Sequence, residues 1–163
     1  MRKWEKMERI NRIAAHPLFR EKLRELETLE QSRIFCRHGL EHLLSVARLA
    51  ALWNEEEQLG FSKEMIYAAA LLHDLGRGAQ YQDGTPHEIA GEALAGRILP
   101  ECGFSGAECR VIVRAIGSHR SNESASEFGA LLYRADKKCR PCYWCEAAEE
   151  CNWTMEKRNG NVI

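Results

Sequence analysis

The sequence predicts an all-α protein of about six to eight helices without a sheet. Apolar residues recur at spacings of three and four rather than two, which is helical periodicity. Gly and Pro fall between the periodic stretches, where they end helices. Three stretches also carry the polar capping pattern that is typical of helix starts. At 163 residues, without repeats or Pro/Gly-rich linkers, we expect one domain with a core of its own.

The N-terminal half predicts three helical segments. A helix or helix pair is expected over residues 3–31, with a break near His16-Pro17, because the residue before a proline disfavours helical backbone. A long helix follows over about residues 39–58 and ends before Gly60. Ser62 is expected to cap a third helix, which runs to His73-Asp74 and stops at Gly76.

The C-terminal half contains the three capping patterns. Thr85-Pro86-His87-Glu88 combines an N-cap, a proline at the first helical position and a capping-box glutamate. Residues 105–108 repeat the spacing before a helix that carries His119. Residues 124–127 repeat it again before a helix that carries Asp136. These patterns predict three further helix starts.

Composition and charge exclude several classes of partner. Acidic residues number 24 and basic residues 23, so no strong field attracts duplex nucleic acid or an anionic membrane surface. The N-terminal stretch lacks the apolar core of a signal peptide, and the apolar run at residues 66–72 is too short to span a bilayer. We therefore expect a cytoplasmic monomer or homodimer whose thiols stay reduced.

Several histidines and aspartates continue apolar helical stripes, and we expect them to point into the core. A single such histidine is usually a hydrogen-bonded core residue, but a buried ionised carboxylate is costly unless it is paired or bound to a cation. Imidazole and carboxylate together suit Fe, Mn, Zn, Co or Ni better than Ca or Mg alone. The pattern therefore predicts a transition-metal site built from His42, His73, Asp74, His119 and Asp136.

Five sequence pieces in order resemble the successive motifs of the HD superfamily of metal-dependent phosphohydrolases. They read RHGLEHLLSVARLA, AAALLHDLGRG, DGTPHEIAGEALAGRIL, AIGSHR and LLYRADKK, and span roughly residues 35–140. The resemblance implies an HD-domain helical bundle. We expect an N-terminal helical extension at 1–34, the HD core at 35–138 and a Cys-rich tail at 139–163.

The resemblance also implies the ligand assignments. His42 matches the first histidine of the family, His73-Asp74 the signature dyad and Asp136 the final aspartate, which together would hold one ion. His87 and His119 match the two further histidines of members that hold two ions, with Asp74 as the bridge. One or two divalent transition-metal ions are expected, with Fe or Mn favoured over Zn, Co and Ni. Without a second ion, His87 and His119 would contact phosphate or shuttle protons.

Three further side chains are expected near the reacting group. Arg77 stands where many family members have lysine; arginine grips phosphate through two parallel hydrogen bonds but is a poor proton donor. Arg120 is a second candidate for binding phosphate. His38 lies one turn before His42 and is expected beside the ligands rather than among them, with its catalytic role left open.

By this resemblance, the sequence predicts a phosphomonoesterase or phosphodiesterase that uses metal-activated water on a small nucleotide or dinucleotide. The Gly-Tyr-Pro motif of the subgroup that cleaves cyclic dinucleotides is missing. Two alternatives remain open at this point. One is a di-iron oxygenase of the HD type, and the other is a non-catalytic nucleotide or redox sensor.

The tail predicts a second metal site. Cys142 and Cys145 have the CxxC spacing that binds metals, and Cys151 follows six residues later. Cys36 is the candidate fourth ligand and Cys139 the alternate. A structural zinc or an iron–sulfur cluster is favoured over free thiols packed with the neighbouring tryptophans, and a disulfide is least favoured. The ending resembles that of a group of small bacterial HD proteins.

Overall fold

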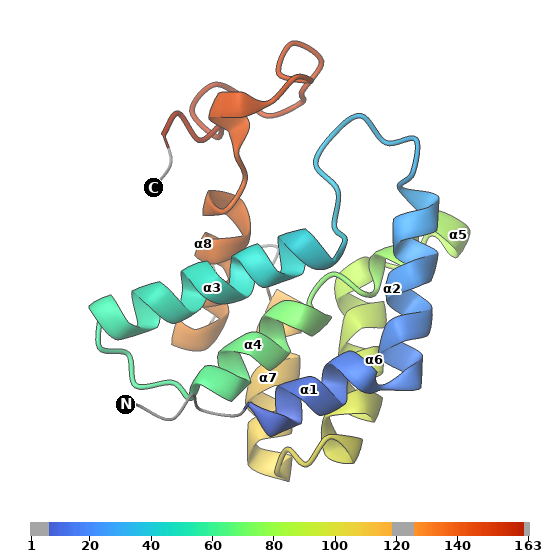
Figure 1. Ribbon diagram of the computed structural model, residues 1–163, viewed down its shortest axis with the longest axis vertical. Helices are drawn as coiled ribbons and strands as arrows, with labels where there is room; N and C mark the ends of the chain where they lie inside the picture. The colour runs from blue at the N-terminus through green and yellow to red at the C-terminus, as the bar shows by residue number, and fades with distance from the viewer. Residues whose placement is uncertain (1–6, 119–125, 162–163) are drawn as a thin grey trace.

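The computed structural model describes residues 7–118 and 126–161, and these residues form helices without any strand (Figure 1). The all-α prediction is therefore confirmed. The elements are α1 (Glu8–Ala15), α2 (Pro17–Leu29), α3 (Leu40–Glu56), α4 (Lys63–Leu72), α5 (Arg77–Asp83), α6 (His87–Glu101), α7 (Gly106–Ser118), α8 (Glu127–Lys138) and the 3-10 helix η1 (Cys142–Trp144).

Helix α4 lies at the centre of the bundle and packs against α1, α3, α6, α7 and α8. From Ile66 to Leu72 every residue of α4 except Tyr67 is buried. This burial explains why the stretch reads as an apolar run instead of an amphipathic stripe. Because α4 ends immediately before His73-Asp74, the signature dyad is delivered to the middle of the molecule.

Most predicted helix boundaries are confirmed. The chain breaks at His16, whose Nδ1 accepts a hydrogen bond from the backbone N–H of Leu18. The Ser62 hydroxyl caps α4 by accepting from the backbone of Met65. Residues 105–108 form a reciprocal capping box, because the side chain at each end accepts from the backbone N–H of the other.

One local prediction was wrong, one helix was not predicted, and one pattern lies partly outside the described residues. Thr85 does not cap α6: Pro86 adopts extended backbone, so the helix begins one residue later, at His87. The backbone N–H of Thr85 donates instead to Asp83. The separate short helix α5 was not predicted. Of the pattern at 124–127, only the last two residues are described, and there Ser126 caps α8.

The turn after α4 depends on a close approach at Gly76. A Cβ atom built there would lie 2.0 Å from the carbonyl oxygen of His87 and 2.6 Å from the backbone nitrogen of Gly91. Glycine therefore lets the start of α6 pack directly against the turn that follows the dyad. This contact brings His87 to the same region as Asp74.

Beyond α8 the chain rises from the same end of the bundle as the loop that joins α2 to α3 (Figure 1), and the two segments line one pocket. We use "the tail" for residues 140–161 and "the α2–α3 loop" for residues 30–39. The tail contains only the three-residue helix η1 and turns. The predicted limits of the extension, the HD core and the Cys-rich segment remain predictions. Among the described residues, no helix has the length and apolar character needed to cross a membrane.

Candidate metal centre

Four predicted ligands meet at one point inside the bundle. His42 comes from α3, His73 and Asp74 from the end of α4, and Asp136 from α8. All four are buried, and one donor atom from each lies within 4.8 Å of the donors of the other three. The structure thus brings together residues that are up to 94 positions apart, from 42 to 136 in the chain.

The distances between these donors fit a bound divalent ion. His42 Nε2 lies 3.1 Å from Asp136 Oδ1 and 3.4 Å from an oxygen of Asp74, and His73 Nε2 lies 3.1 Å from that same Asp74 oxygen. Ligands bonded at about 2.1 Å to one ion lie roughly 3.0–3.5 Å from their neighbours. The centre therefore has both the donor chemistry and the spacing of a transition-metal site.

The imidazole rings are held so that Nε2 faces the centre. His73 Nδ1 lies 2.7 Å from the carbonyl oxygen of Ala70 and donates to it, which leaves the Nε2 lone pair for a metal. His42 Nδ1 faces the sulfur of Cys139 at 3.5 Å, and this thiol donates to the carbonyl oxygen of Asp136 at 3.4 Å. Sequence reasoning missed this role of Cys139, which only its position three residues after Asp136 would have suggested.

The two oxygens of Asp74 face different partners. Oδ2 faces His42 and His73, whereas Oδ1 accepts from Arg77 Nε at 2.7 Å and lies 3.8 Å from His87 Nε2. The ring of His87 is fixed through Nδ1, which donates to Gln80 at 2.7 Å. His87 thus lies where the predicted second ion would need it. His119 and Arg120 lie outside the described residues.

The charges of the centre favour a cation. Burial alone would raise the pKa of Asp136, but hydrogen bonds from His42 and His73 hold that pKa well below its ordinary value. Burial alone would lower the pKa of His73, but the carboxylates of Asp74 and Asp136 raise it to about 10. The imidazole and carboxylate groups thus stabilise each other's charged forms, and a cation that replaces the His73 proton would meet the same negative charge.

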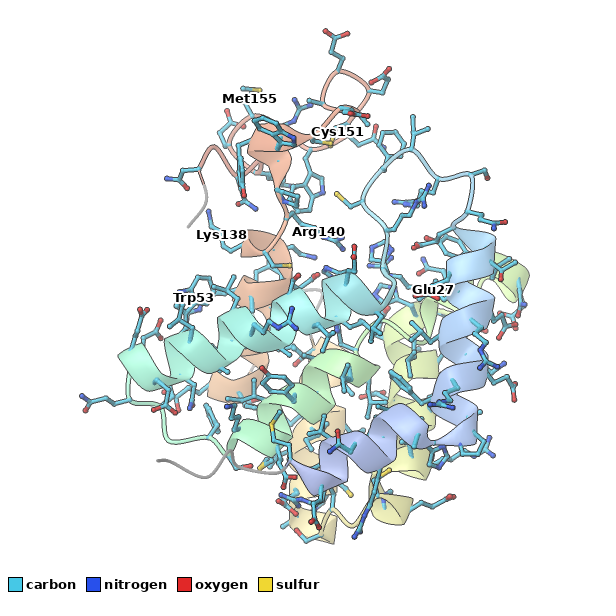
Figure 2. The ribbon with its side chains drawn as sticks, viewed as in Figure 1. Glu27, Trp53, Lys138, Arg140, Cys151 and Met155 are labelled. Carbon is cyan, nitrogen blue, oxygen red and sulfur yellow. The ribbon has the colours of Figure 1, made fainter. Side chains whose placement is uncertain are left out.

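Two arginines reach the centre from opposite sides. Burial alone would lower the pKa of Arg77, but Asp74 raises it, so this guanidinium stays charged. Arg140 is 8% exposed; its Nη2 lies 3.1 Å from His42 Nε2, and its Nη1 donates to the carbonyl oxygen of Arg37 at 2.7 Å. Figure 2 shows Arg140 between the end of α8 and the α2–α3 loop. Sequence reasoning missed Arg140, although it lies one helical turn after Asp136.

A buried polar triad adjoins the ligands. The carboxylate of Glu30 is 1% exposed and accepts from the backbone N–H of His38 at 2.6 Å, from His38 Nδ1 at 2.5 Å and from the Tyr81 hydroxyl at 2.7 Å. Burial alone would raise the pKa of Glu30, but these hydrogen bonds lower it to about 2. Burial lowers the pKa of His38 to about 4.

His38 packs edge-on against His42, with ring centroids 5.7 Å apart, and does not belong to the four-ligand group. This position agrees with the expectation that it lies beside the ligands. Glu30 and Tyr81 were not predicted, because nothing local in the sequence links the end of α2 to α5.

One large pocket opens onto the metal centre. Its volume is about 1070 Å³, at the upper end of the range for small-molecule sites. Two of the four ligands, His42 and Asp136, line it together with basic side chains, and residues of the α2–α3 loop and the tail line it as well. The four predicted tail-site cysteines, Cys36, Cys142, Cys145 and Cys151, all line the same pocket.

A helical bundle that holds a buried His/Asp centre at the end of its central helix defines a class of metal-binding hydrolase folds. The chain belongs to the HD domain family, whose model matches residues 39–142. In structure it is similar to a predicted HD superfamily hydrolase from an uncultured Thermotogales bacterium, with a TM-score of 0.63 and 25% identity over 87% of this chain and 82% of that one.

Relatives in sequence fall into two groups. A Clostridium beijerinckii protein named only as uncharacterized is 43% identical over 156 residues, which cover 96% of this chain and 99% of that protein. Ribonuclease Y of Clostridium tetani is 29% identical over 122 residues, or 75% of this chain. The match spans only 21% of that ribonuclease. Family and donor set together support a metal-dependent hydrolase.

Proposed function

We propose that this protein is a metal-dependent phosphohydrolase that cleaves a phosphomonoester or phosphodiester bond in a small nucleotide or dinucleotide. The observation that carries the proposal is the convergence of a four-ligand metal centre and two charged arginines on one pocket. Cations and guanidinium groups stabilise phosphoryl transfer, because its transition state spreads negative charge over the phosphoryl oxygens.

One group of residues would bind metal, and another would bind phosphate. His42, His73, Asp74 and Asp136 would hold one Fe or Mn ion, and Asp74 with His87 and His119 would hold a second. When bound, a divalent ion makes a neighbouring water more acidic and offsets charge on the phosphoryl group. The mixed donors support Fe or Mn, with Zn, Co and Ni as the remaining candidates.

Arg77 and Arg140 are oriented before substrate arrives. The Nε of Arg77 donates a hydrogen bond to Asp74, and Nη1 of Arg140 donates one to the backbone carbonyl of Arg37. Both guanidinium groups are therefore held in position. The Nη groups of Arg77 would donate to phosphate oxygens. Nη2 of Arg140 lies 3.1 Å from His42 Nε2 and would turn to phosphate when His42 binds the ion. Preorganised donors of this kind stabilise developing charge without a reorganisation cost at the moment of reaction.

The pair Glu30–His38 is proposed to hold a proton acceptor at the wall of the pocket. Because His38 Nδ1 donates to the Glu30 carboxylate, its Nε2 carries the lone pair. His38 lines the pocket beside His42, where Nε2 would exchange a proton with water or with the leaving group. In this arrangement Glu30 positions His38 and does not itself contact substrate.

The substrate class is supported by pocket size and by similarity to ribonuclease Y. A volume of about 1070 Å³ accommodates a nucleotide or dinucleotide. The relatives named ribonuclease Y support a phosphodiester of ribonucleotides, although this chain corresponds to about a fifth of their length. A net charge of −1 gives no field to attract a long polyanion, so a small substrate is proposed.

A substrate panel tests this proposal. Anaerobically purified protein loaded with Mn²⁺ or Fe²⁺ is assayed against phosphomonoesters, nucleotides and dinucleotides. Asp74→Ala should lose bound metal and about a thousandfold or more in kcat/KM, since it removes the shared ligand. Asp83→Ala, an exposed aspartate, is the matched control and should keep both.

Three outcomes would overturn the proposal. Turnover that requires dioxygen would indicate a di-iron oxygenase, because hydrolysis proceeds without it. Tight nucleotide binding without turnover under any of the metals would indicate a sensor. Full activity and metal content in Asp74→Ala would remove the metal centre from the mechanism.

A further inference from the structure

Four cysteines outside the four-ligand centre line the same pocket. Cys36 lies in the α2–α3 loop, and Cys142, Cys145 and Cys151 lie in the tail. The two segments rise from the same end of the bundle (Figure 1), and Cys151 lies on the side of the tail that faces the loop (Figure 2). All four are free thiols and half-buried. The fold thus brings Cys36 to a trio of cysteines more than 100 residues away.

The tail has too little apolar packing to hold its conformation by burial. Among the described residues, the hydrophobic core and the side chains packed on it include none beyond Cys139. Trp144 is 85% exposed and Met155 77% exposed, and Trp153 is only half-buried, so the large apolar side chains of the tail contribute little burial. Irregular segments that lack a core usually depend on a metal or another cross-link for their order.

Side-chain hydrogen bonds to backbone carbonyls hold the tail. Asn159 donates to the carbonyl oxygens of Lys137, Lys138 and Arg140. Arg158 donates to the carbonyl oxygen of Cys151 at 3.0 Å. These contacts close the tail into a loop that presents its cysteines inward, but they do not bridge the tail to Cys36.

The spacing of the sulfurs distinguishes between two kinds of metal site. Four thiolates around one zinc ion at about 2.3 Å lie about 3.8 Å from one another. In the described part of the chain, only the His/Asp centre gathers three or more donors within 4.8 Å, so no three of these sulfurs approach so closely. A [4Fe–4S] cluster holds its thiolates farther apart, because each binds a different iron at a corner of the cube.

Electrostatic contacts connect the four thiols. Burial raises the pKa of Cys36; Cys142, Cys145 and Cys151 raise it further, while Arg140 opposes them. The backbone N–H of Trp153 donates to Cys151 Sγ at 3.5 Å, and such bonds to the sulfurs tune cluster potentials. Arg140 therefore lies between the cysteine group and the His/Asp centre, where its charge faces both.

We propose that Cys36, Cys142, Cys145 and Cys151 bind a [4Fe–4S] cluster that forms one wall of the substrate pocket. On transfer from a donor that carries the preassembled cluster, four Fe–S(Cys) bonds form as the four bonds to the donor's thiolates break. The departing thiolates take up the protons that the four thiols release, so the number of electrons does not change. Cys139 is not a ligand, because its sulfur lies against His42 and the backbone of Asp136. The cysteines are separate from the ligands of the hydrolytic centre, and only the expected effect on substrate binding rests on the proposed hydrolysis.

A cluster in this position would make substrate binding in the pocket depend on iron supply and on exposure to oxygen. Loss of the cluster would loosen the tail beyond Arg140, which stays bonded to Arg37, and would open one wall, while the ligands on α3, α4 and α8 stay in place. We therefore expect the protein without its cluster to show a raised KM for substrate and a nearly unchanged affinity for Mn²⁺ at the hydrolytic centre.

Iron and acid-labile sulfide, measured per chain in anaerobically purified and reconstituted protein, test the site. Sulfide is specific to the cluster, since ions at the His/Asp centre carry none. We expect about four sulfides per chain, with absorption and Mössbauer spectra of a [4Fe–4S] cluster. Cys36→Ser should lose most of the sulfide, as should the same change at each of the other three ligands.

Matched controls separate the two metal sites. Cys109→Ser and Cys139→Ser should keep the sulfide, because neither thiol belongs to the proposed group. Asp74→Ala should keep the sulfide while losing hydrolytic activity, so failure of the cluster and failure of the proposed function are distinguishable. If a ligand variant fails to fold by circular dichroism, wild-type protein stripped by a chelator and rebuilt anaerobically with Fe²⁺, Fe³⁺ and sulfide gives the count instead.

Each of three results would overturn the cluster. The first is about one zinc per chain with no sulfide after anaerobic reconstitution. The second is full sulfide content in Cys36→Ser, which would remove the loop from the site. The third is stripped wild-type protein that takes up no sulfide although its helices are intact.

Discussion

The His/Asp centre and the cysteine group face the same pocket, yet the chain builds them in opposite ways. The ligands of the centre extend from α3, α4 and α8, which pack against one another in the hydrophobic core. The cysteines lie on a loop and a tail that contain almost no regular structure. The difference indicates a preformed site in the first case and, in the second, a site whose order depends on what it binds.

The physical origin of this difference is the kind of interaction that holds each region. Side chains such as Leu72, Leu75 and Ile116 are fully buried around the centre, and burying one such side chain is worth about 1.5–3 kcal/mol. The tail relies on hydrogen bonds such as those of Asn159, each worth about 0.5–1.5 kcal/mol net. The bundle should therefore fold without metal, while the tail should open locally.

The largest expected effect is on the stability of the bundle that holds the preformed centre. Gly76→Ala places a Cβ atom 2.0 Å from the backbone of α6, where no flexible side chain can give way. We expect a loss of about 3 kcal/mol or more in unfolding free energy, measured by urea denaturation. Gly96→Ala, in an open position of the same α6, should instead be neutral or stabilising by up to about 1 kcal/mol. Equal stability of both variants would contradict the close approach.

Removal of iron tests directly whether the tail opens more easily than the bundle. Stripping the wild-type protein with a chelator should speed amide hydrogen exchange in residues 140–161 by about tenfold or more, because local opening then costs little. Amides of α4 should keep their protection, since they lie in the core. Exchange measured by mass spectrometry reports both regions in one experiment. Uniform loss of protection across α4 and the tail would mean that the two regions do not differ.

Replacement of Cys139 tests how firmly the centre orients its own ligands. Cys139→Val removes the sulfur that faces His42 Nδ1 while keeping an apolar side chain of similar size. Groups that orient a metal-bound histidine typically contribute about 10- to 100-fold in affinity. We expect weaker Mn²⁺ binding near the lower end of that range, with partial recovery in Cys139→Ser. Unchanged affinity, measured by chelator competition, would assign Cys139 to packing alone.

The smallest expected effect concerns the base of the α2–α3 loop. The folded pKa of Glu30 is about 2, below its ordinary value of 4.5, so its contribution to stability is present above pH 4.5. That contribution is lost as the pH falls through 2. Between pH 4.5 and pH 3.5 we expect unfolding free energy to fall by about 1 kcal/mol from this group. Glu30→Gln should reduce the slope of unfolding free energy against pH. An unaltered slope would mean that another group is responsible for it.

Helical periodicity and capping chemistry are local, so the sequence by itself determined much of the architecture. Residues three and four apart share a helix face wherever the helix lies, which placed His42 and Asp136 in the core before any tertiary contact was known. The capping pattern at 105–108 was confirmed for the same reason. The pattern at Thr85 was wrong, because the extended backbone of Pro86 moved the helix start to His87.

Only the tertiary structure decided which distant residues meet. Packing of α3 against α8 placed Arg140 and Cys139 beside His42, and packing of α2 against α5 joined Glu30 to Tyr81. The path of the tail set Cys36 opposite the other cysteines of the pocket. No local pattern encodes these contacts, because they depend on how buried surfaces of separate helices fit together and on where the connecting chain then runs.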